Sequence, residues 1–372
     1  MCTVEKCRLP LKNGRNTFSI YRTLKNISKR FSVSNDEVPK IPLSLSMVGW
    51  IAIILAAGLQ LRAPEDSVIR IMFWNLENFF DWRNDSTSVS DIEFSSRGAR
   101  HWTRKRFYTK CNAVAKGILW AGSEKGGLPD AIGFAEIENS FVIKRLLQST
   151  ALRKLDYKLL HFESPDARGI DVALLYRTSR LKLTEAKPCH LYDQDSTILT
   201  TRDILLACFE TRSKSNQKIA VLVNHHPSKY GGVKVSEPKR LIAVKRLRQL
   251  ADSLNLAGFQ KIVAMGDFND TPANPVYRLL EPALVNLADS LYRRGKGTIK
   301  YDGAWELIDM FFAAPDCLPG KMSILQIPFL QTKDGAHSGT KPLRTYSGPR
   351  YMGGVSDHCP IWLEIKSSSI YE

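Results

Sequence analysis

The chain has 372 residues, of which 44% are hydrophobic and 24% are charged, and this ordinary globular composition excludes a low-complexity protein. Its length suits one large domain or two smaller ones. The net charge of +16 divides unevenly, because residues 1–62 hold ten Lys and Arg but only three Asp and Glu. A basic surface suits phosphate-bearing partners, although the excess charge serves solubility equally well.

The seven cysteines are scattered along the chain, and no CxxC pair occurs. A zinc site built from thiolates is therefore disfavoured. Five of the cysteines follow residue 62, and one disulfide, for example between Cys189 and Cys208, stays open at this point.

The N-terminal part of the chain reads as two segments. Residues 1–42 are polar and basic without clear periodicity, and we expect them to form an extension that is disordered or not translated. If Met47 is the true first residue, the segment before it does not exist in the protein.

An apolar segment follows over residues 43–62, with no charged residue from Leu43 to Leu61. This span is long enough to cross a bilayer as a helix. It also fits a signal peptide, with Ala56 and Ala57 near the cleavage point. We expect an exported protein, periplasmic or secreted, or a membrane-anchored one; a buried core helix is the alternative.

After residue 66 the pattern changes to short apolar runs between helical stretches. An amphipathic helix is predicted over 236–254, with Ser236 as its N-cap, and a similar helix over 104–120. Turn-forming residues bound the predicted strands, which are 68–74, 131–137, 170–176, 219–225 and 261–267. Strands that alternate with helices indicate an α/β protein, and we predict one domain over 66–368.

Several of these strands end in polar side chains of the same kinds. The strand-end residues are Asn75, Glu77, Asn78, Glu136, Glu138, Asn224, His225, His226, Asp267, Asn269, Asp309, Asp357 and His358. A carboxylate or imidazole there costs stability unless it is paired or ligating. The recurrence therefore predicts a shared site at one edge of the sheet.

The stretch VAMGDFNDTP, residues 263–272, shows the problem most clearly. Residues i and i+2 of an extended strand point the same way, so Asp267 and Asn269 could face one small target beyond the strand. The alternative is a simple turn, because Gly, Asp, Asn and Pro are common turn formers.

The residue types favour a hard, oxygen-binding cation, Mg²⁺ or Mn²⁺, because carboxylates gather here without cysteines. His225 and His226 are adjacent in a strand, point to opposite faces and cannot easily share one metal ion. Metal, acid/base and neutral amide groups together describe phosphoester hydrolysis.

The ordered motifs resemble those of the endonuclease/exonuclease/phosphatase superfamily, the fold of pancreatic deoxyribonuclease, and most resemble an uncharacterised bacterial branch. They run through nearly all of 68–366 and are WNLEN (74–78), FAEIEN (134–139), RGIDVALLY (168–176), VNHHPS (223–228), GDFND (266–270), LID (307–309) and SDHCPI (356–361). The resemblance implies a four-layer α/β/β/α sandwich of two packed mixed sheets flanked by helices.

The resemblance also implies roles for single residues. Glu136 would be the main metal ligand, with Asn75 and Asp357 close by. Asp267 would deprotonate the attacking water, and Asn269 would bind the phosphate and help to hold Asp267.

Two histidines complete these roles. His358, polarised by Asp309, would stabilise charge on the phosphate oxygens. His225 would assist the leaving group, with Asp171 as a plausible partner.

Other residues are candidates for substrate binding. Arg168 could contact phosphate, and Asp171 could instead form a surface ion pair with it. Arg344, Tyr346 and Arg350, within 341–351, could line the cleft. The segment 100–110 could track phosphates with stacking aromatics, or form the solvated face of a helix.

We therefore predict a divalent-metal-dependent phosphodiesterase, most simply a monomeric nuclease acting on DNA or RNA. The alternative within the fold is a phosphatase or phosphodiesterase for an inositol phosphate, a lipid or another small phosphoester. A catalytically dead binding module would have lost Glu136, Asp267, Asn269 or His358, and all four are present.

Overall fold

The computed structural model of the chain describes residues 68–83, 88–213, 216–229 and 232–366. The extension 1–42 and the apolar segment 43–62 lie outside these ranges, so what the sequence predicts for them stays a prediction. Within the described ranges, no helix is both long enough and apolar enough to cross a membrane.

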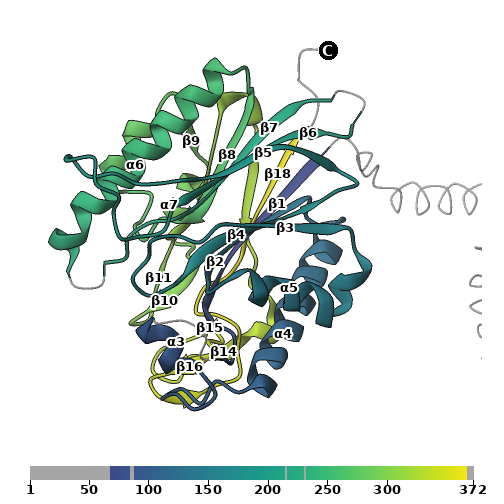
Figure 1. The fold of residues 1–372 in the computed structure, drawn as a ribbon, viewed down its shortest axis with the longest axis vertical. Coiled ribbons are helices and arrows are strands. Elements are labelled where there is room, and N and C mark those ends of the chain that lie inside the picture. Colours follow the sequence, from purple (N-terminus) through teal and green to yellow (C-terminus); the bar gives the residue numbers. More distant parts are fainter. Residues whose placement is uncertain (1–67, 84–87, 214–215, 230–231, 367–372) are drawn as a thin grey trace, which may run out of the picture. The chain divides into compact units, whose positions relative to one another are not determined.

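Two six-stranded sheets form the centre of the molecule (Figure 1). The first has the order β13–β18–β1–β2–β4–β3 and is built from β1 (Val68–Phe79), β2 (Ala131–Ile137), β3 (Tyr157–His161), β4 (Asp171–Arg177), β13 (Lys321–Ile324) and β18 (Ile361–Lys366). The second has the order β5–β6–β7–β8–β12–β9 and is built from β5 (Leu181–Cys189), β6 (Ile204–Thr211), β7 (Lys218–His225), β8 (Lys261–Asp267), β9 (Val285–Asn286) and β12 (Asp309–Ala313).

Both sheets are mixed, because each contains one parallel pair among antiparallel neighbours. The parallel pairs are β1 with β2 and β7 with β8. Three small antiparallel ribbons lie outside the sheets: β10 (Ile299–Tyr301) with β11 (Ala304–Glu306), β14 (Gln331–Lys333) with β15 (Thr340–Pro342), and β16 (Tyr346–Ser347) with β17 (Arg350–Tyr351).

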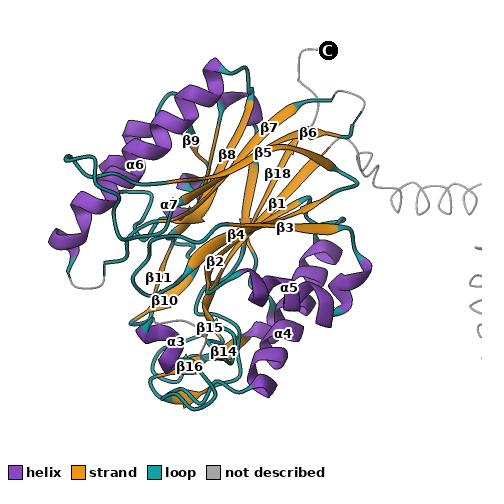
Figure 2. Ribbon diagram, viewed as in Figure 1, coloured by secondary structure: helices purple, strands orange, loops and turns teal. Residues whose placement is uncertain are grey.

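Helices cover the outer faces of both sheets, which gives the predicted four layers (Figure 2). The first sheet carries α4 (Arg104–Glu124) and α5 (Ser140–Ser149), and the second carries α6 (Val233–Leu256) and the short α7 (Asp289–Arg293). Short α3 (Val89–Glu93) lies near the ribbons. The 3₁₀ turns are Ala151–Lys154, Pro275–Leu280, Pro315–Cys317 and Pro328–Leu330.

Alternate residues of the central strands fill two separate cores. In β1, Ile71 and Phe73 pack between the sheets, whereas Met72 and Trp74 pack under α4. Side chains of a strand alternate between faces, and both faces of β1 are covered. The strand therefore reads as a continuous apolar run rather than an alternating one.

The predicted helices are present with different ends. Helix α4 begins after Thr103, whose hydroxyl accepts a hydrogen bond from Arg106 N, and it runs on to Glu124. Helix α6 follows Gly232, so the prediction of Ser236 as its N-cap is wrong. Ser236 lies inside the first turns and its hydroxyl donates to Gly232 O.

Among the strands of the two sheets, the sequence did not predict β3, β5, β6, β9 or β13. Strand β5 is an edge strand with mostly part-exposed side chains, so it lacks the apolar run that identified the central strands. The prediction that Cys189 and Cys208 could form a disulfide is wrong. Both cysteines are free and buried. They do not face each other, because the β5–β6 register sets Cys189 opposite Ile204 and Cys208 opposite Glu185.

Gly266, the last residue before Asp267, marks a close approach of β8 to β7. A Cβ atom at this position would lie 2.3 Å from Asn224 O, which is backbone and cannot move aside. We expect Gly266→Ala to destabilise the protein by about 2–3 kcal/mol, measured by urea unfolding. Gly335→Ala, where a Cβ meets nothing within 4 Å, is the control and should change little. Equal stability of the two variants would contradict this account.

Candidate active site

The polar residues at the strand ends gather at one edge of the two-sheet core. Parallel strands end on the same side of their sheet, and β2 contacts both β7 and β8 across the interface. The carboxyl ends of β1, β2, β7 and β8 therefore meet. They bring together Asn75, Glu136, His225 and Asp267.

Glu136 reaches this edge because β2 bulges there. Ala135 pairs with Val172 and Ile137 with Asp171, so one extra residue stands between them. Phe134 and Ile137 both pack under the helices, although strict alternation would place them on opposite faces of β2. The bulge therefore releases Glu136 from the alternation of side chains between the two faces. Its φ of 58° is in the left-handed region.

Backbone strain is concentrated around the same edge. Glu77, Asn78 and Asn269 also have positive φ values, of 45°, 48° and 51°. Non-glycine residues adopt this region at a cost and do so most often at functional sites. The strain has a local use, because Asn78 N donates to Glu136 Oε2 at 2.9 Å.

Asp267 is buried and held from two sides. Asn75 Nδ2 donates to its Oδ2 at 3.0 Å, and Asn269 N donates to its Oδ1 at 2.8 Å. Strand β8 ends at Asp267, so Asn269 does not point along with it as an extended strand would require. The chain turns, and the backbone of Asn269, not its side chain, holds the acid.

The Asn269 side chain is fixed separately. Its Nδ2 donates to His226 O at 2.9 Å. A carbonyl oxygen only accepts, so this contact also settles which end of the carboxamide is nitrogen. The ring of His226 is buried edge-on against Phe268, with centroids 4.7 Å apart.

His358 and Asp309 form a tight pair. His358 Nδ1 lies 2.7 Å from Asp309 Oδ2, and His358 Nε2 lies 3.9 Å from Asp267 Oδ2. The backbone of His358 is tied to β1, since Trp74 Nε1 donates to His358 O. Ser356, which the sequence did not single out, donates to Asn75 O and accepts from His358 N.

His225 lies beside the acids on the other flank. Its Nε2 is 3.9 Å from Glu136 Oε1 and 3.8 Å from Asp267 Oδ2, both longer than a hydrogen bond. Burial, with the nearby positive charges of Arg202 and Arg168, holds the pKa of His225 well below its usual value. The ring is therefore neutral.

Burial acts oppositely on the two charged partners. It raises the pKa of Asp267 to about 7, with Asp309 adding to the effect and His358 opposing it. Burial alone would lower the pKa of His358, but Asp309 and Asp267 raise it well above its usual value. The site thus holds a cationic imidazole beside a carboxylate that can accept a proton near neutral pH.

A second network holds Arg344 next to Asp357. Arg344 Nη2 lies 2.8 Å from Glu77 Oε1 and 3.0 Å from Asp357 Oδ2. Thr345 N donates to Glu77 Oε2, and Lys110 Nζ donates to Glu77 O. Glu77, one of the strand-end residues, is the acceptor that joins this loop to β1.

Arg168 is presented by the loop between β3 and β4. Its side chain is 43% exposed, and its N donates to Asp166 Oδ1. Its positive charge is one of those that lower the pKa of His225.

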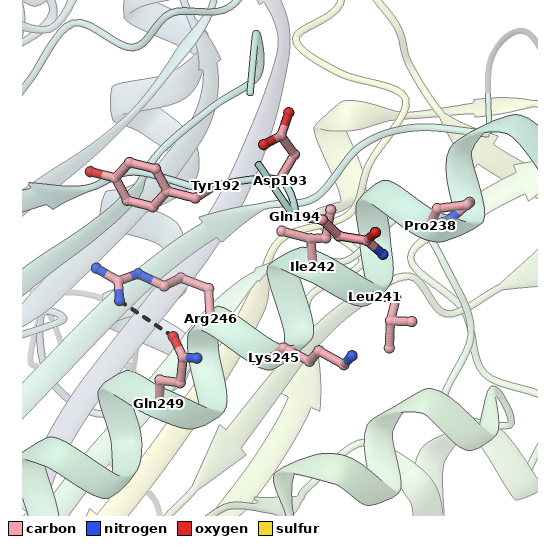
Figure 3. A pocket seen from close by; sticks show the side chains of 9 residues that line it. All are labelled: Tyr192, Asp193, Gln194, Pro238, Leu241, Ile242, Lys245, Arg246 and Gln249. Atoms are coloured by element: carbon pink, nitrogen blue, oxygen red, sulfur yellow. Dashed lines mark hydrogen bonds between the residues drawn. The ribbon is translucent and has the colours of Figure 1, made fainter. Parts of the chain in front are cut away.

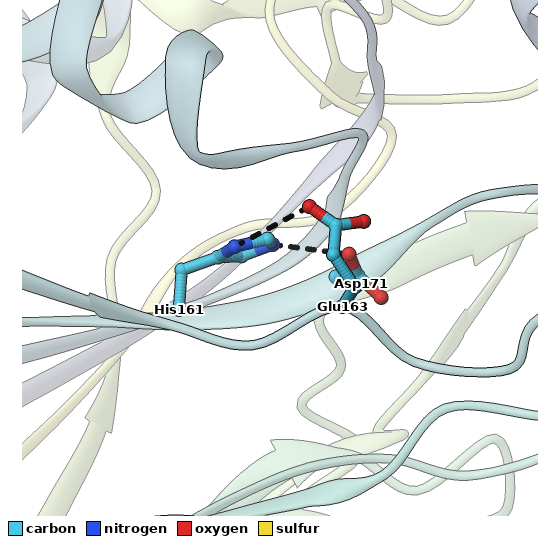
Figure 4. Close-up of side chains that lie close together, drawn as sticks. All are labelled: His161, Glu163 and Asp171. Carbon is cyan, nitrogen blue, oxygen red and sulfur yellow. Dashed lines mark hydrogen bonds and ion pairs between the residues drawn. The ribbon is translucent and has the colours of Figure 1, made fainter. Parts of the chain in front are cut away.

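Two predicted substrate contacts lie elsewhere. Asp171 pairs with His161, at 3.0 Å from Nε2, and accepts from Ser164 N, so the expected pairing with His225 is wrong (Figure 4). Glu163 Oε1 lies 3.8 Å from the other ring nitrogen of His161, Nδ1. These contacts account for the His161 cluster without an ion.

Tyr346 is buried, and its hydroxyl donates to Arg100 O. Its ring packs against Trp102 and Tyr351, so it supports the loop more than it faces solvent. Of the aromatics in segment 100–110, Trp102 and Phe107 are buried and Tyr108 is half-buried, edge-on to Phe107. The phosphate-tracking role of this segment stays a prediction, and Arg350 lies exposed in the ribbon β16–β17.

Several hollows lie on the described surface, and one of about 310 Å³ adjoins the 3₁₀ turn Pro275–Leu280. Two others matter for the site. One of about 120 Å³ adjoins the site and is lined by Glu77, Asn78, Phe94, Arg100, Arg344, Thr345, Tyr346 and Gly348. The other, of about 370 Å³, lies along α6 and is lined by Tyr192, Asp193, Gln194, Pro238, Leu241, Ile242, Lys245, Arg246 and Gln249 (Figure 3). No predicted site residue lines the α6 hollow.

The residues at the edge suit a hard divalent cation. Glu136 and Asp267 both lie near His225 Nε2, at 3.9 and 3.8 Å, and Asp267 and Asp357 both lie 3.9 Å from His358 Nε2. These distances are too long for hydrogen bonds. Among the described residues, Asn75 Oδ1 accepts only from Glu77 N, which leaves a lone pair for a ligand. Oxygen donors without sulfur fit Mg²⁺ or Mn²⁺.

The family model described as the Endonuclease/Exonuclease/phosphatase family matches residues 70–367. The chain belongs to the endonuclease/exonuclease/phosphatase family. Its class of chemistry is therefore phosphoester hydrolysis. A comparison with curated protein sequences finds no match.

Solved structures of the endonuclease/exonuclease/phosphatase fold are similar to this chain. A family protein from Bacteroides thetaiotaomicron is 13% identical and covers 81% of this chain and 98% of its own, with a TM-score of 0.52. The human Nocturnin catalytic domain with a bound sulfate anion is 17% identical, covers 80% and 93%, and has a TM-score of 0.51. Truncated TDP2 from Caenorhabditis elegans is 14% identical, covers 81% and 98%, and has a TM-score of 0.50. At these identities the likeness concerns the fold.

Asp267→Asn tests the electrostatics of the site without any substrate. Because the folded pKa is raised to about 7, ionising Asp267 destabilises the wild-type fold progressively as pH rises from about 4 to 7. The asparagine side chain of the variant does not titrate. The free energy of unfolding of the variant minus that of the wild type should therefore increase from pH 5 to pH 8, on the order of 1–4 kcal/mol.

Urea unfolding in EDTA at both pH values measures this difference. The carboxamide of the variant keeps one acceptor oxygen, so the variant also loses one of the hydrogen bonds from Asn75 Nδ2 and Asn269 N, but that loss is the same at both pH values and cancels. A relative stability that stays constant from pH 5 to 8 would show that Asp267 is not held in the way described.

Proposed function

We propose that the chain is a divalent-metal-dependent phosphodiesterase that hydrolyses nucleic acid. The observation that carries this proposal is the juxtaposition at one edge of a buried Asp267 and the His358–Asp309 pair, 3.9 Å apart. A base and a cation side by side can act on an attacking water and on the phosphate that it attacks.

Asp267 accepts the proton of the attacking water. A pKa of about 7 leaves the carboxylate basic enough to take that proton and ionised often enough to do so at neutral pH. Asn75 Nδ2 and Asn269 N orient its two oxygens. One hydrogen of the Asn269 carboxamide is donated to His226 O, so the second can be donated to a phosphate oxygen.

His358 stabilises the negative charge that develops on the phosphate. Asp309 keeps the imidazole protonated and fixes the ring, so that Nε2 faces Asp267 and the reacting group. His225, neutral and on the opposite flank, is placed to hydrogen-bond the leaving oxygen.

Glu136, Asn75 and Asp357 would hold the divalent ion, Mg²⁺ or Mn²⁺. The ion supplies charge neutralisation and polarisation of a phosphoryl oxygen when bound. Arg344 keeps Asp357 in place through the contact at 3.0 Å.

Cationic side chains around the centre support a polymeric substrate. Arg168 belongs to the β3–β4 loop, Lys229 follows β7, and Arg344 precedes β18. Each of these three side chains is between 38% and 48% exposed, and its charged group also pairs with a carboxylate. Exposed cations on several loops suit the successive phosphates of DNA or RNA.

One observation favours the second candidate, a phosphatase or phosphodiesterase for a small phosphoester. The hollow of about 120 Å³ next to Glu77 and Arg344 has room for a small group rather than a duplex. An inositol phosphate or a lipid headgroup would place its non-reacting part there.

Glu136→Gln tests the role of the ion. It removes the charge of the main ligand, and we expect hydrolysis to fall about 100-fold or more, with weaker Mn²⁺ binding by titration calorimetry. Glu138→Gln is the matched control, because Glu138 is two residues away, buried, and accepts from Asp81 N instead. Retention of Mn²⁺ binding in Glu136→Gln would rule out this ligand assignment.

The assay compares plasmid DNA, single-stranded RNA and bis-p-nitrophenyl phosphate, each with Mg²⁺, Mn²⁺ or EDTA. We expect the wild-type protein to cleave DNA or RNA. EDTA and the Asp267→Asn substitution should each abolish this cleavage. Cleavage of the small diester alone would transfer the assignment to the second candidate.

We also propose that the enzyme is monomeric and that the apolar segment 43–62 directs it out of the cytoplasm, as a cleaved signal or as an anchor. The support is the uncharged run from Leu43 to Leu61 after a basic segment. Residues 1–66 fused to alkaline phosphatase in a bacterium should give activity that is lost when 43–61 are deleted. Equal activity of both fusions would contradict export.

A further inference from the structure

Arg202 is a buried arginine outside every motif of the site. It precedes β6 in the second sheet, and its side chain is 6% exposed. Its Nη1 donates to Asp166 Oδ2 at 2.9 Å, and its Nη2 donates to His226 O at 2.6 Å. One guanidinium thus spans the β3–β4 loop of the first sheet and the loop after β7 in the second.

Both partners of Arg202 continue to residues of the candidate site. Asp166 accepts from Arg168 N and, through its backbone O, from Gly169 N, so it closes the turn that presents Arg168. His226 O accepts from Arg202 and also from Asn269 Nδ2, which gives each lone pair of that oxygen one donor.

The second contact orients Asn269. A carbonyl oxygen with two donors at 2.6 and 2.9 Å cannot rotate away without breaking one of them. The backbone of Asn269 in turn holds Asp267 at 2.8 Å. The chain of contacts therefore runs from Asp166 through Arg202 and His226 to Asn269 and the general base.

We propose that Arg202 is a positioning residue of the catalytic centre, which sets the orientation of Asn269 and the place of the Arg168 loop without touching the substrate. This inference rests on the proposed function for its kinetic part. This role explains why a cation is buried between loops of the two sheets. The planar guanidinium can satisfy two acceptors in a fixed geometry. A lysine has one ammonium and cannot hold both acceptors in that geometry.

Arg202→Met and Arg202→Lys are the test variants, and Arg180→Met is the matched control. Arg180 also spans a carboxylate and a carbonyl, Asp130 Oδ1 at 2.9 Å and Val68 O at 3.0 Å, but next to the start of β1 instead of the site. Arg202→Lys keeps the charge opposite Asp166, so it should remain folded if Arg202→Met does not.

The first measurement is amide hydrogen exchange, which needs no substrate. In both Arg202 variants we expect faster exchange in peptides covering 162–170 and 226–229, and in Arg180→Met no change there. Unchanged protection of these peptides in the Arg202 variants would overturn the proposal. This result stands even if the wild-type protein hydrolyses none of the phosphoesters, an outcome that would refute the proposed function alone.

The second measurement is a double-mutant cycle on hydrolysis. If Arg202 acts through Asn269, Arg202→Lys should lower kcat about 10- to 100-fold in the wild-type background and less than about 3-fold in Asn269→Ala. Arg180→Met should leave kcat of the folded protein unchanged. An equal loss in both backgrounds would show that Arg202 does not act through Asn269 and would overturn the proposal.

Discussion

The burial of Asp267 between two sheets is the constraint on which the rest of the site depends. A carboxylate at this depth is costly unless hydrogen bonds and charges compensate it. Asn75, the backbone of Asn269 and the His358–Asp309 pair supply that compensation from four different segments of the chain. Removing water from around the acid is also what brings its pKa to about 7. The same burial therefore makes the position unfavourable for folding and useful for proton transfer.

Two further carboxylates have the same problem and the same solution. Glu77 is buried beside Arg344 and Thr345, and Asp166 is buried beside Arg202. In each case an arginine links the acid to another loop, so that one ion pair fixes two segments. Such pairs contribute little net stability, since desolvation offsets the attraction, but they specify geometry. The loops at this edge are thus held by directional contacts, whereas the sheets below them are held by apolar packing.

The sequence predicts the strands that are buried on both faces, because these strands form continuous apolar runs. Strands β1, β2, β7 and β8 are covered on both faces and read as continuous apolar runs, so their existence followed directly. The end of β1 did not, because the strand runs on to Phe79 and the prediction stops at residue 74. Strand β5, at an edge with part-exposed side chains, carries no such pattern and was missed. The N-terminus of α6 was misplaced because Ser236 is a good cap by residue type, and the helix already begins after Gly232.

The site could be predicted where a polar residue follows an apolar strand, as Asp267 and Glu136 do. The manner in which they are held could not be, because it depends on local backbone that departs from regular structure. The bulge that redirects Glu136 and the left-handed conformation of Asn269 break the period-2 rule on which a strand prediction rests. Asp171 shows the reverse error. It begins β4 and lies in the expected motif, yet His161 on the neighbouring strand β3 makes the contact that was expected for His225.

Stability and activity consequently reside in different parts of this molecule. Glu77, Asn78, Glu136 and Asn269 all have strained backbone, and Asp309 Oδ1 and His225 Nδ1 are buried without a hydrogen-bond partner in the described structure. Each of these features costs free energy. All lie at one edge, where the four central strands end. The two apolar cores, between the sheets and beneath α4, offset that cost at a distance from the chemistry. Substitutions in the cores should therefore change how much protein is folded, whereas substitutions at the edge should change what the folded protein does.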